Sequence, residues 1–254
     1  LIFRIPTPHI FLFKNLGLLL FPFFLLPFLF MKHRIDLVYE RGRIFGGVGV
    51  FLAALFHVRS VYELNEPYHD IPILLGKFSL AFFFISFIRK WHQYIVKKAS
   101  LITVTHTSLI HHGAAPAEKT IIIDHGVDTS HFFPASSKVR SKYNLKKKFV
   151  VLYSGSFAPW HACERIILAA QLLREHRDIV FLLVGKGDML KRCRMLVKQL
   201  NLERSVIFTG AVPYRAMPDY INAADVCLAL FDRTYPPFLK YSFFYSPMKI
   251  NEYR

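Results

Sequence analysis

The stretch FVVLYSGSFAPWHACERIILAA at residues 149–170 decides the fold. It begins with six residues that carry no charge, turns at Gly155 and continues from Cys163 with the pattern of a helix. A continuous apolar run of this length is typical of a strand that is covered on both faces. A strand, a tight turn and a helix in this order form part of a βαβ unit. The stretch therefore predicts a parallel sheet with right-handed crossovers.

The same alternation extends from Asp36 to the end of the chain. We predict strands at residues 36–40, 60–64, 101–105, 120–123, 149–154, 179–185, 205–209 and 225–230, and helices at residues 46–56, 83–98, 163–175, 189–200 and 215–223. The Lys- and Ser-rich run at residues 136–148 is the best linker, so the sequence predicts two α/β domains, residues 1–140 and residues 141–254. Ligands of such sheets bind outside the carboxyl ends of the strands, and the loops there are the places to search.

The composition favours anionic partners. The chain of 254 residues has 33 Lys and Arg against 17 Asp and Glu, a formal net charge of +16. Its 26 Phe residues favour a membrane face over a nucleic-acid groove. The basic residues are not interleaved with aromatic residues in a recognised motif, so we expect no nucleic-acid partner. The three cysteines are too few for a disulfide framework, which favours a cytoplasmic setting.

The first residues predict contact with a membrane surface. Residues 16–31 carry no charge, but this run is shorter than the roughly 20 residues that a bilayer core needs, and Pro22 and Pro27 interrupt it. Basic residues follow it and also follow Phe82–Phe84 and Phe87. We expect peripheral binding to the inner face of the cell membrane, with burial of both segments inside the first domain as the alternative. The chain begins with Leu1 and stops just after Glu252, so we also expect a fragment.

Three loops of the second half are candidates for binding an anionic ligand. The turn at Gly155 would let backbone N–H groups approach a phosphate, with His161 close to the same anion. The loop Gly185-Lys186-Gly187-Asp188 follows the next strand, and the loop from Gly210 to Tyr214 could form a flat slot for a base. Each loop can also be an ordinary strand-to-helix turn.

Charged residues gather at three other places. Lys249 and Glu252 are three residues apart on one face of a predicted helix, where they could serve as a cation for phosphate and a carboxylate for ribose hydroxyls. An ordinary ion pair within the helix is the alternative. In the first half, strand ends carry Glu40 with Arg41, and Glu63 with Asn65 and Glu66. Individually these residues could be solvated loop residues.

Taken together and in order, these segments resemble the retaining GT-B glycosyltransferases of family 4, the glycosyl transferases group 1. The matching segments are DLVYERG at 36–42, SVYELNEP at 60–67, IDHGVDTSHFFP at 123–134, LYSGSFAPWHACERIILAA at 152–170, FLLVGKGD at 181–188, VIFTGAVPY at 206–214, AADVCLALF at 223–231 and YSPMKINEY at 245–253. The resemblance implies two Rossmann-like domains facing a cleft, incomplete at both ends here. The C-terminal domain would bind a nucleotide-sugar donor, and the N-terminal domain would shape the acceptor site.

The resemblance assigns roles to individual residues. Gly155 is similar to the glycine of the diphosphate loop, and Glu252 to the second glutamate of a paired motif that holds the ribose; Phe244 stands where the first glutamate is expected. Asn65 stands at the position of the family's histidine, and His161 at that of its helix-entry lysine. The predicted site comprises catalytic His161, Lys249 and Asn65, donor-binding Gly155, Ser156, Gly185, Gly187, Gly210, Val212 and Glu252, and acceptor-side Glu40, Arg41 and Glu63.

The expected reaction is transfer of a hexose from a nucleoside diphosphate sugar to a lipid-linked or polysaccharide acceptor with retention. Charge on the departing diphosphate would be met by the Gly155–Ser156 backbone, the helix start at Ala162, Lys249 and a protonated His161. No Asp-x-Asp pair follows an apolar strand, so we expect neither a metal nor another cofactor. The alternatives are a nucleotide-sugar epimerase, a basic peripheral membrane or nucleic-acid-binding protein, and an inactive truncated copy.

Overall fold

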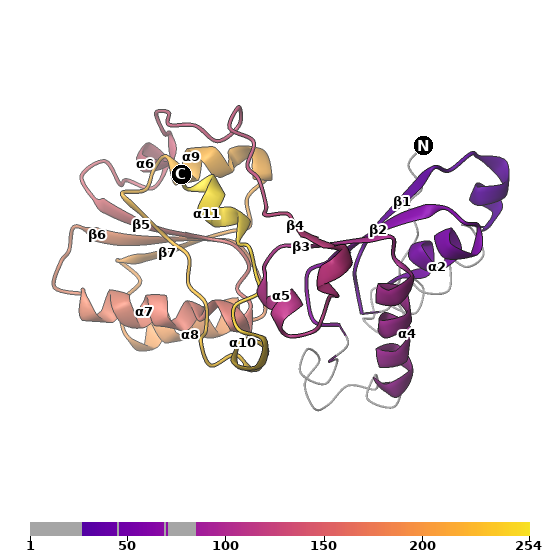
Figure 1. Cartoon of the computed structure of the whole chain (residues 1–254). Coiled ribbons are helices and arrows are strands. Elements are labelled where there is room, and N and C mark those ends of the chain that lie inside the picture. The colour runs from indigo at the N-terminus through magenta and orange to yellow at the C-terminus, as the bar shows by residue number, and fades with distance from the viewer. Residues whose placement is uncertain (1–26, 45, 69, 71–84) are drawn as a thin grey trace. The chain divides into compact units, whose positions relative to one another are not determined.

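The chain forms two units, each with its own parallel sheet (Figure 1). The computed structural model describes residues 27–44, 46–68, 70 and 85–254. Unit 1 comprises Leu1–Asp124 with Pro236–Ser246, and unit 2 comprises His125–Tyr235 with Pro247–Arg254. The chain thus enters unit 2 earlier than the predicted boundary at residue 140, and returns once to each unit near its end.

The predicted linker at residues 136–148 is part of unit 2. It contains the short helix α6 (Val139–Lys142), and Val139 and Leu145 are buried in the core of that unit. The backbone N–H of Lys138 donates to Asp219 Oδ1 at 2.9 Å, which fixes this segment to a residue 81 positions later in the chain. The high Lys content suggested a solvated linker, but two apolar side chains in the run were enough to anchor it.

Unit 1 is built on four parallel strands in the order β1-β2-β3-β4. The strands are β1 (Leu37–Arg41), β2 (Arg59–Leu64), β3 (Leu101–Val104) and β4 (Thr120–Ile122). Two helices join them, α2 (Val48–Leu55) and α4 (Ile85–Lys98), and they pack on each other through Phe51 and Trp91, whose rings are 5.7 Å apart. The register pairs Arg41 with Glu63, and Glu63 with Thr103. Polar residues at the carboxyl ends of these strands therefore lie side by side.

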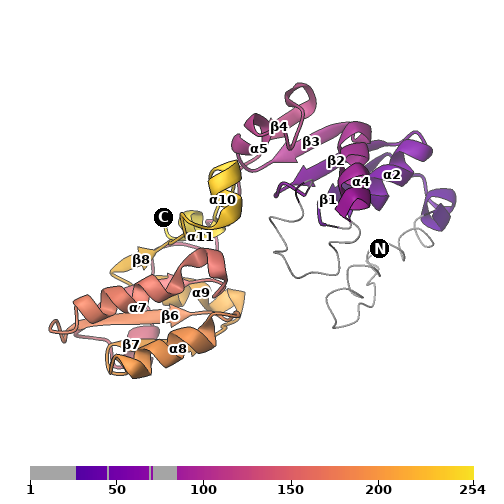
Figure 2. The ribbon, with the colours of Figure 1, turned by 90° about the horizontal axis from the view of Figure 1, so that it is seen from below.

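Unit 2 has four parallel strands in the order β7-β6-β5-β8. They are β5 (Phe149–Ser154), β6 (Ile179–Val184), β7 (Val206–Gly210) and β8 (Val226–Leu228). The helices α7 (Cys163–Leu172) and α8 (Leu190–Gln199) cover one face, and α9 (Met217–Ile221) lies on the other (Figures 1 and 2). All eight predicted strands are confirmed within two residues at each end.

Each face of the unit 2 sheet has its own buried core. Alternate residues of β5 point to opposite faces: Val151 and Tyr153 pack with α7 and α8, whereas Val150 and Leu152 pack with α6 and α9. This division explains why the decisive strand is apolar at nearly every position, since both of its faces are covered.

The remaining elements are short. The described elements not named so far are α5 (Ser108–His111), α10 (Pro236–Tyr241), α11 (Met248–Glu252) and the 3₁₀ turns η2 (Ala117–Lys119), η3 (Pro159–His161) and η4 (Tyr214–Ala216). The sequence pattern did not predict α5, α6 or α10, because elements of four to six residues are too short to show a helical period.

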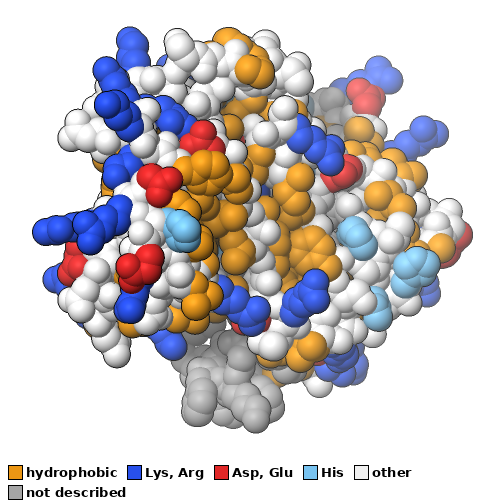
Figure 3. All heavy atoms as spheres, turned by 90° about the vertical axis from the view of Figure 1, so that its left-hand side faces the viewer, with side chains coloured by type: hydrophobic (Ala, Val, Ile, Leu, Met, Phe, Trp, Pro, Cys, Tyr) orange, Lys and Arg blue, Asp and Glu red, His pale blue; other side chains and the backbone are white. Residues whose placement is uncertain are grey.

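The positive charge of the chain is exposed. Lys and Arg side chains are spread over the face shown in Figure 3, with hydrophobic side chains between them. Among the described residues, no helix is long and apolar enough to cross a membrane. Residues 16–26 of the apolar run that was predicted to dock on a membrane lie outside the described residues, and so do Phe82, Phe83 and Phe84.

Candidate functional site

A cavity of about 430 Å³ lies at the carboxyl ends of β5, β6 and β7, entirely within unit 2. It is lined by Ser154, Gly155, Ser156, Val184, Gly185, Lys186, Ala211, Val212, Tyr214, Met217, Lys249 and Glu252. The sequence placed six of these residues in the donor site: Gly155, Ser156, Gly185, Val212, Lys249 and Glu252. Strand ends that are far apart in sequence meet here because the strands run parallel.

Two glycines let the loops after β5 and β6 touch. Gly155 and Gly185 have φ angles of 142° and 141°, which side chains rarely allow. A Cβ on Gly185 would lie 1.8 Å from the carbonyl oxygen of Gly155, so no other residue fits. The Gly155 N–H donates to the carbonyl of Val184 at 3.0 Å. Of the predicted Gly155–Ser156 pair, the Gly155 N–H is therefore already used within the fold, and the anion-binding role of the Ser156 N–H stays a prediction.

Gly187 and Gly210 do not line the cavity. A Cβ on Gly187 would lie 2.7 Å from backbone atoms of Phe157, so this glycine allows the loop after β6 to pack on the loop after β5. The carbonyl of Gly210 accepts a hydrogen bond from the Gly185 N–H at 2.9 Å. Both glycines therefore hold together the loops that form the cavity. The sequence analysis had instead predicted that they contact the donor directly.

Lys249 supplies a buried positive charge to this cavity. Its Nζ lies 4.5 Å from the centre of the Tyr153 ring, and it has no hydrogen-bond partner among the described residues. A Cβ on Gly155 would lie 2.8 Å from Nζ, so the missing side chain of Gly155 makes room for the ammonium group. Burial lowers the pKa of Lys249 to about 8, and the nearby Cys163 and Glu252 oppose the shift. The group therefore stays mainly protonated at pH 7.

His161 differs from the prediction of a protonated catalytic group. It is buried, and its Nδ1 lies 3.3 Å from the carbonyl oxygen of Leu230. Burial and the positive charge of Lys249 lower the pKa of His161 to about 4, so the ring is neutral at pH 7. His161 does not line the cavity. The sequence could not reveal this, because the burial of His161 depends on the packing of Phe231 against its ring, with centroids 5.1 Å apart.

Glu252 lies at the end of α11 and lines the same cavity. Its pKa is raised by burial, while a hydrogen bond from the Tyr214 hydroxyl and the charge of Lys249 oppose the shift. Next to it, the Tyr253 hydroxyl lies 2.8 Å from Ser154 Oγ and accepts a hydrogen bond from the Ser154 N–H at 3.2 Å. Tyr253 thus fastens α11 to the end of β5, which holds Lys249 and Glu252 at the cavity.

Six residues that line this cavity were not among the predicted site residues: Ser154, Val184, Lys186, Ala211, Tyr214 and Met217. Tyr214 was noted only as the end of a possible slot for a base. Its contact with Glu252 joins residues 38 positions apart, and no local pattern indicates such a contact. For Lys186 the sequence did offer one indication of a place in the cavity, because this residue stands between Gly185 and Gly187 in the loop after a strand.

In unit 1, Glu40 has a structural role that the sequence did not predict. Its two carboxylate oxygens accept hydrogen bonds from the backbone N–H groups of Gly47, at 2.6 Å, and Val50, at 3.0 Å. These groups belong to the start of α2, whose first N–H groups have no partner within the helix. Burial raises the pKa of Glu40, and the backbone hydrogen bonds oppose the shift. The acceptor-side role of Glu40 stays a prediction.

Glu63, Arg41 and Asn65 form a cluster at the ends of β1 and β2. The Glu63 carboxylate accepts hydrogen bonds from the Tyr39 hydroxyl and the Asn65 amide, both at 2.6 Å, and lies 3.4 Å from the Arg41 guanidinium. The Oδ1 atom of Asn65 is buried and has no hydrogen-bond partner among the described residues. An oxygen of this kind can accept a hydrogen bond from a hydroxyl group. The catalytic role of Asn65 and the acceptor-side roles of Arg41 and Glu63 also stay predictions.

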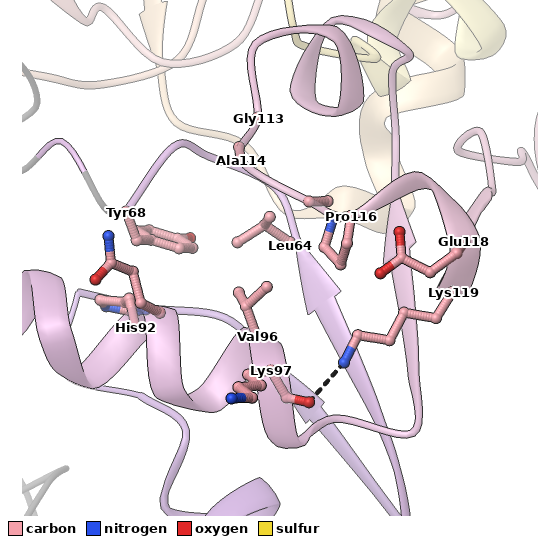
Figure 4. A pocket seen from close by; sticks show the side chains of 12 residues that line it. Leu64, Tyr68, His92, Val96, Lys97, Gly113, Ala114, Pro116, Glu118 and Lys119 are labelled. Atoms are coloured by element: carbon pink, nitrogen blue, oxygen red, sulfur yellow. Dashed lines mark hydrogen bonds between the residues drawn. The ribbon is translucent and has the colours of Figure 1, made fainter.

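Unit 1 contains a cavity of about 520 Å³ whose lining differs in character from that of the unit 2 cavity (Figure 4). The side chains of Leu64, Val96 and Pro116 line its middle. Polar groups on its wall are bound within the fold: the Tyr68 hydroxyl donates to the Gly42 carbonyl, and Lys119 Nζ donates to the carbonyl of Lys97. This wall suits an apolar occupant better than a phosphate, and none of the predicted site residues lines it.

Two α/β units, each built on a parallel sheet, are the architecture of the GT-B fold, and unit 2 has a cationic cavity at the carboxyl ends of its strands. Residues 136–232 match the family model described as Glycosyl transferases group 1. The matched segment makes up most of unit 2 and is similar to the group 1 glycosyltransferases. The resemblance noted in the sequence is confirmed in this respect.

Known relatives agree with this class. The chain is 27% identical over 200 residues to mannosylfructose-phosphate synthase of Agrobacterium fabrum, which covers 72% of this chain and 43% of that protein. The fold is similar to that of WaaG, a glycosyltransferase involved in lipopolysaccharide biosynthesis, with a TM-score of 0.66, 15% identity, and coverage of 94% of this chain and 65% of WaaG. It is also similar to Anabaena HepE in complex with UDP, with a TM-score of 0.59, 22% identity, and coverage of 80% and 55%. The chain spans less than half the length of the curated relative.

Proposed function

We propose that this chain is the donor-binding part, with some of the acceptor part, of a retaining glycosyltransferase. Unit 2 would bind a nucleoside diphosphate sugar, and the sugar would pass to a hydroxyl group of a lipid-linked or polysaccharide acceptor. The observation that carries the proposal is the buried ammonium of Lys249, which has no hydrogen-bond partner among the described residues and lines the same cavity as Gly155 and Glu252. A buried cation without an anion is costly, and a bound anion would relieve that cost.

The cavity offers what departure of a diphosphate requires. Negative charge develops on the leaving group, and a preorganised cation stabilises it most in a site with little water. In our proposal Lys249 and the Ser156 N–H meet this charge, and the Glu252 carboxylate accepts hydrogen bonds from ribose hydroxyls. Neutral His161 would act only through packing and through its effect on Lys249. The charge of Lys249 removes the need for a metal ion or another cofactor in this scheme.

The relatives support the substrate classes. HepE was solved with UDP, which favours a nucleotide donor here. The names of WaaG and of the mannosylfructose-phosphate synthase favour a saccharide acceptor. In our proposal the acceptor hydroxyl approaches the Glu63 cluster, where the Oδ1 atom of Asn65 would accept its hydrogen bond.

Glu252→Gln tests the donor site. Removal of the carboxylate charge should weaken the binding of UDP, GDP or ADP, whichever binds best, by about tenfold, because a hydrogen bond to a charged acceptor contributes about 1.5–3 kcal/mol. In a longer homologous chain, catalysis by the bound complex should change less than donor affinity. Calorimetric titration measures the affinity, and Glu203→Gln, which removes the same charge from an exposed residue of unit 2, serves as the control. Equal affinities of Glu252→Gln and wild type would rule out the role of Glu252.

A second proposal places the protein on an anionic membrane surface at the cytoplasmic side. Ile88, His92 and Ile95 of α4 are buried, whereas the side chain of Phe87 is 59% exposed. The basic residues of the helix, Arg89, Lys90, Lys97 and Lys98, are all exposed. An exposed aromatic ring among basic side chains is what an interfacial helix presents to acidic lipids.

We expect the chain to sediment with vesicles of anionic lipid at low salt and to be released at high salt. Each basic residue near such a surface contributes about 1 kcal/mol, so the pair Lys90→Glu and Lys98→Glu should weaken binding at least about tenfold. The matched pair Lys191→Glu and Lys198→Glu on α8 makes the same charge change on an exposed helix of unit 2 and should bind like wild type. Equal, negligible binding of wild type to anionic and neutral vesicles would leave burial of the apolar segments as the better account.

A further inference from the structure

We propose that Tyr214 is a positioning residue of the donor site: its hydroxyl orients Glu252 for the ribose, and its ring is the surface on which the base lies. The inference rests on the proposed function and extends it to the nucleoside end of the donor. Tyr214 begins η4, directly after the loop that follows β7, and Glu252 ends α11. Both residues line the same cavity of unit 2.

The first observation is the contact between the two side chains. Tyr214 and Glu252 line the same cavity, and the Tyr214 hydroxyl donates to the Glu252 carboxylate. Burial, the charge of Glu252 and this hydrogen bond raise the pKa of Tyr214. A carboxylate has two oxygens with about four sites for hydrogen bonds, so one bond from Tyr214 leaves room for both hydroxyls of a ribose. The contact fixes the direction of the carboxylate before a ligand binds.

The second observation is that neighbouring rings hold Tyr214 in place. The His131 ring lies 5.5 Å from the Tyr214 ring, tilted by 37°, and the Phe132 ring lies 5.5 Å away at 62°. Despite these contacts, Tyr214 remains 55% exposed. A ring that is fixed on one side and open on the other loses little conformational freedom when a flat ligand stacks on it.

The third observation is the order of the groups around the cavity. Lys249 and Glu252 are three residues apart on α11, and Tyr214 adjoins Glu252. A cation, a carboxylate and an aromatic ring thus follow one another in the order of the diphosphate, ribose and base of a nucleotide. Stacking of a base on an aromatic side chain contributes about 1–3 kcal/mol and tolerates every base.

Two substitutions separate the hydroxyl from the ring. Binding is measured by calorimetry with UDP, GDP and ADP, and the nucleotide that binds wild type best is then compared with its 2′,3′-dideoxy form. Tyr214→Phe should weaken binding of the ribonucleotide about fivefold and leave binding of the dideoxynucleotide unchanged. Tyr214→Ala should weaken binding of both by a further tenfold or so. Tyr143→Phe removes another hydroxyl of unit 2, one that lies 3.4 Å from the Tyr220 hydroxyl, and should match wild type.

The outcomes distinguish this inference from the proposed function. If wild type binds none of the three nucleotides, both fail. If wild type binds one of them and both Tyr214 variants bind it equally well, only the role of Tyr214 fails. Equal losses of Tyr214→Phe for the ribonucleotide and the dideoxynucleotide would also overturn it, because the effect would then not pass through Glu252 and the ribose. Thermal melting of each variant shows that the fold is intact, which the exposure of Tyr214 leads us to expect.

Discussion

Lys249→Met should remove the preference of the chain for nucleoside diphosphates over nucleosides, and it should leave the fold at least as stable as before. The ammonium of Lys249 is buried without a hydrogen-bond partner among the described residues, so its positive charge opposes folding. Met keeps the length of the side chain and its packing on the Tyr153 ring. We expect UDP affinity to fall about a hundredfold, because charge-assisted bonds to phosphate are among the strongest that side chains make.

Two controls test whether the loss of affinity comes from the charge of Lys249: a substitution of a second lysine, and the dependence of UDP affinity on pH. Lys191→Met removes a charge from an exposed position of α8 and should bind UDP as wild type does. In wild type, UDP affinity should decline as the pH rises above about 8, since the lowered pKa of Lys249 means that its charge is lost there. In Lys249→Met this decline should disappear. A variant that keeps wild-type affinity, or a wild-type profile that is flat from pH 7 to pH 9.5, would contradict the assignment of Lys249 as the phosphate-binding cation.

The sign of the stability effect follows from the same pKa. Burial lowers the pKa of Lys249 to about 8 in the folded chain, against its ordinary value of 10.5 in the unfolded chain, so the unfolded chain binds more protons between these values. Stability therefore rises with pH over this range as the cost of the buried charge disappears. Lys249→Met removes the cost at every pH, and its melting temperature should exceed that of wild type most clearly at pH 7.

The local pattern of the sequence was sufficient to predict the strands and the loops of the donor cavity. The apolar run at residues 149–154 could only be a covered strand, and Gly155, Lys249 and Glu252 stood in segments that resemble a known family. What could not be predicted depends on contacts over long distances in the chain. His161 is neutral because it is buried and because Lys249, 88 residues later in the chain, brings a positive charge near it. Glu40 is engaged because α2 begins beside it.

The boundary between the units shows the same limit. Residues 136–148 look like a linker because eight of the thirteen are Ser or Lys, with an Arg and an Asn beside them. The composition cannot show that Val139 and Leu145 meet the Val150 side of the sheet. The exchange of Pro236–Ser246 back into unit 1 is equally invisible in the pattern, because it rests on contacts such as the Tyr241 hydroxyl donating to Asp70 at 2.8 Å.

Gly185→Ala should destabilise unit 2 by about 3 kcal/mol or more and abolish nucleotide binding. A Cβ at this position would lie 1.8 Å from the Gly155 carbonyl oxygen, and the φ angle of 141° is one that only glycine adopts readily. Relief of the clash requires the loops after β5 and β6 to separate. Their separation would break the Gly155 N–H bond to Val184 and move Gly155 away from Lys249. Urea unfolding measures the loss of stability, and UDP titration measures the loss of binding.

Substitutions at two other glycines of unit 2 distinguish the steric clash from backbone strain as the cause of the lost stability. Gly210→Ala meets no atom within 4 Å but has a φ of 76°, so it should cost about 1–2 kcal/mol from backbone strain alone. Gly126→Ala has neither a close neighbour nor a positive φ and should change stability by less than about 0.5 kcal/mol. The predicted order of destabilisation is therefore Gly185 first, Gly210 second and Gly126 last. If Gly185→Ala unfolds no more easily than Gly210→Ala, the two loops do not meet as the structure shows, and the cavity that brings Lys249 to Gly155 loses its basis.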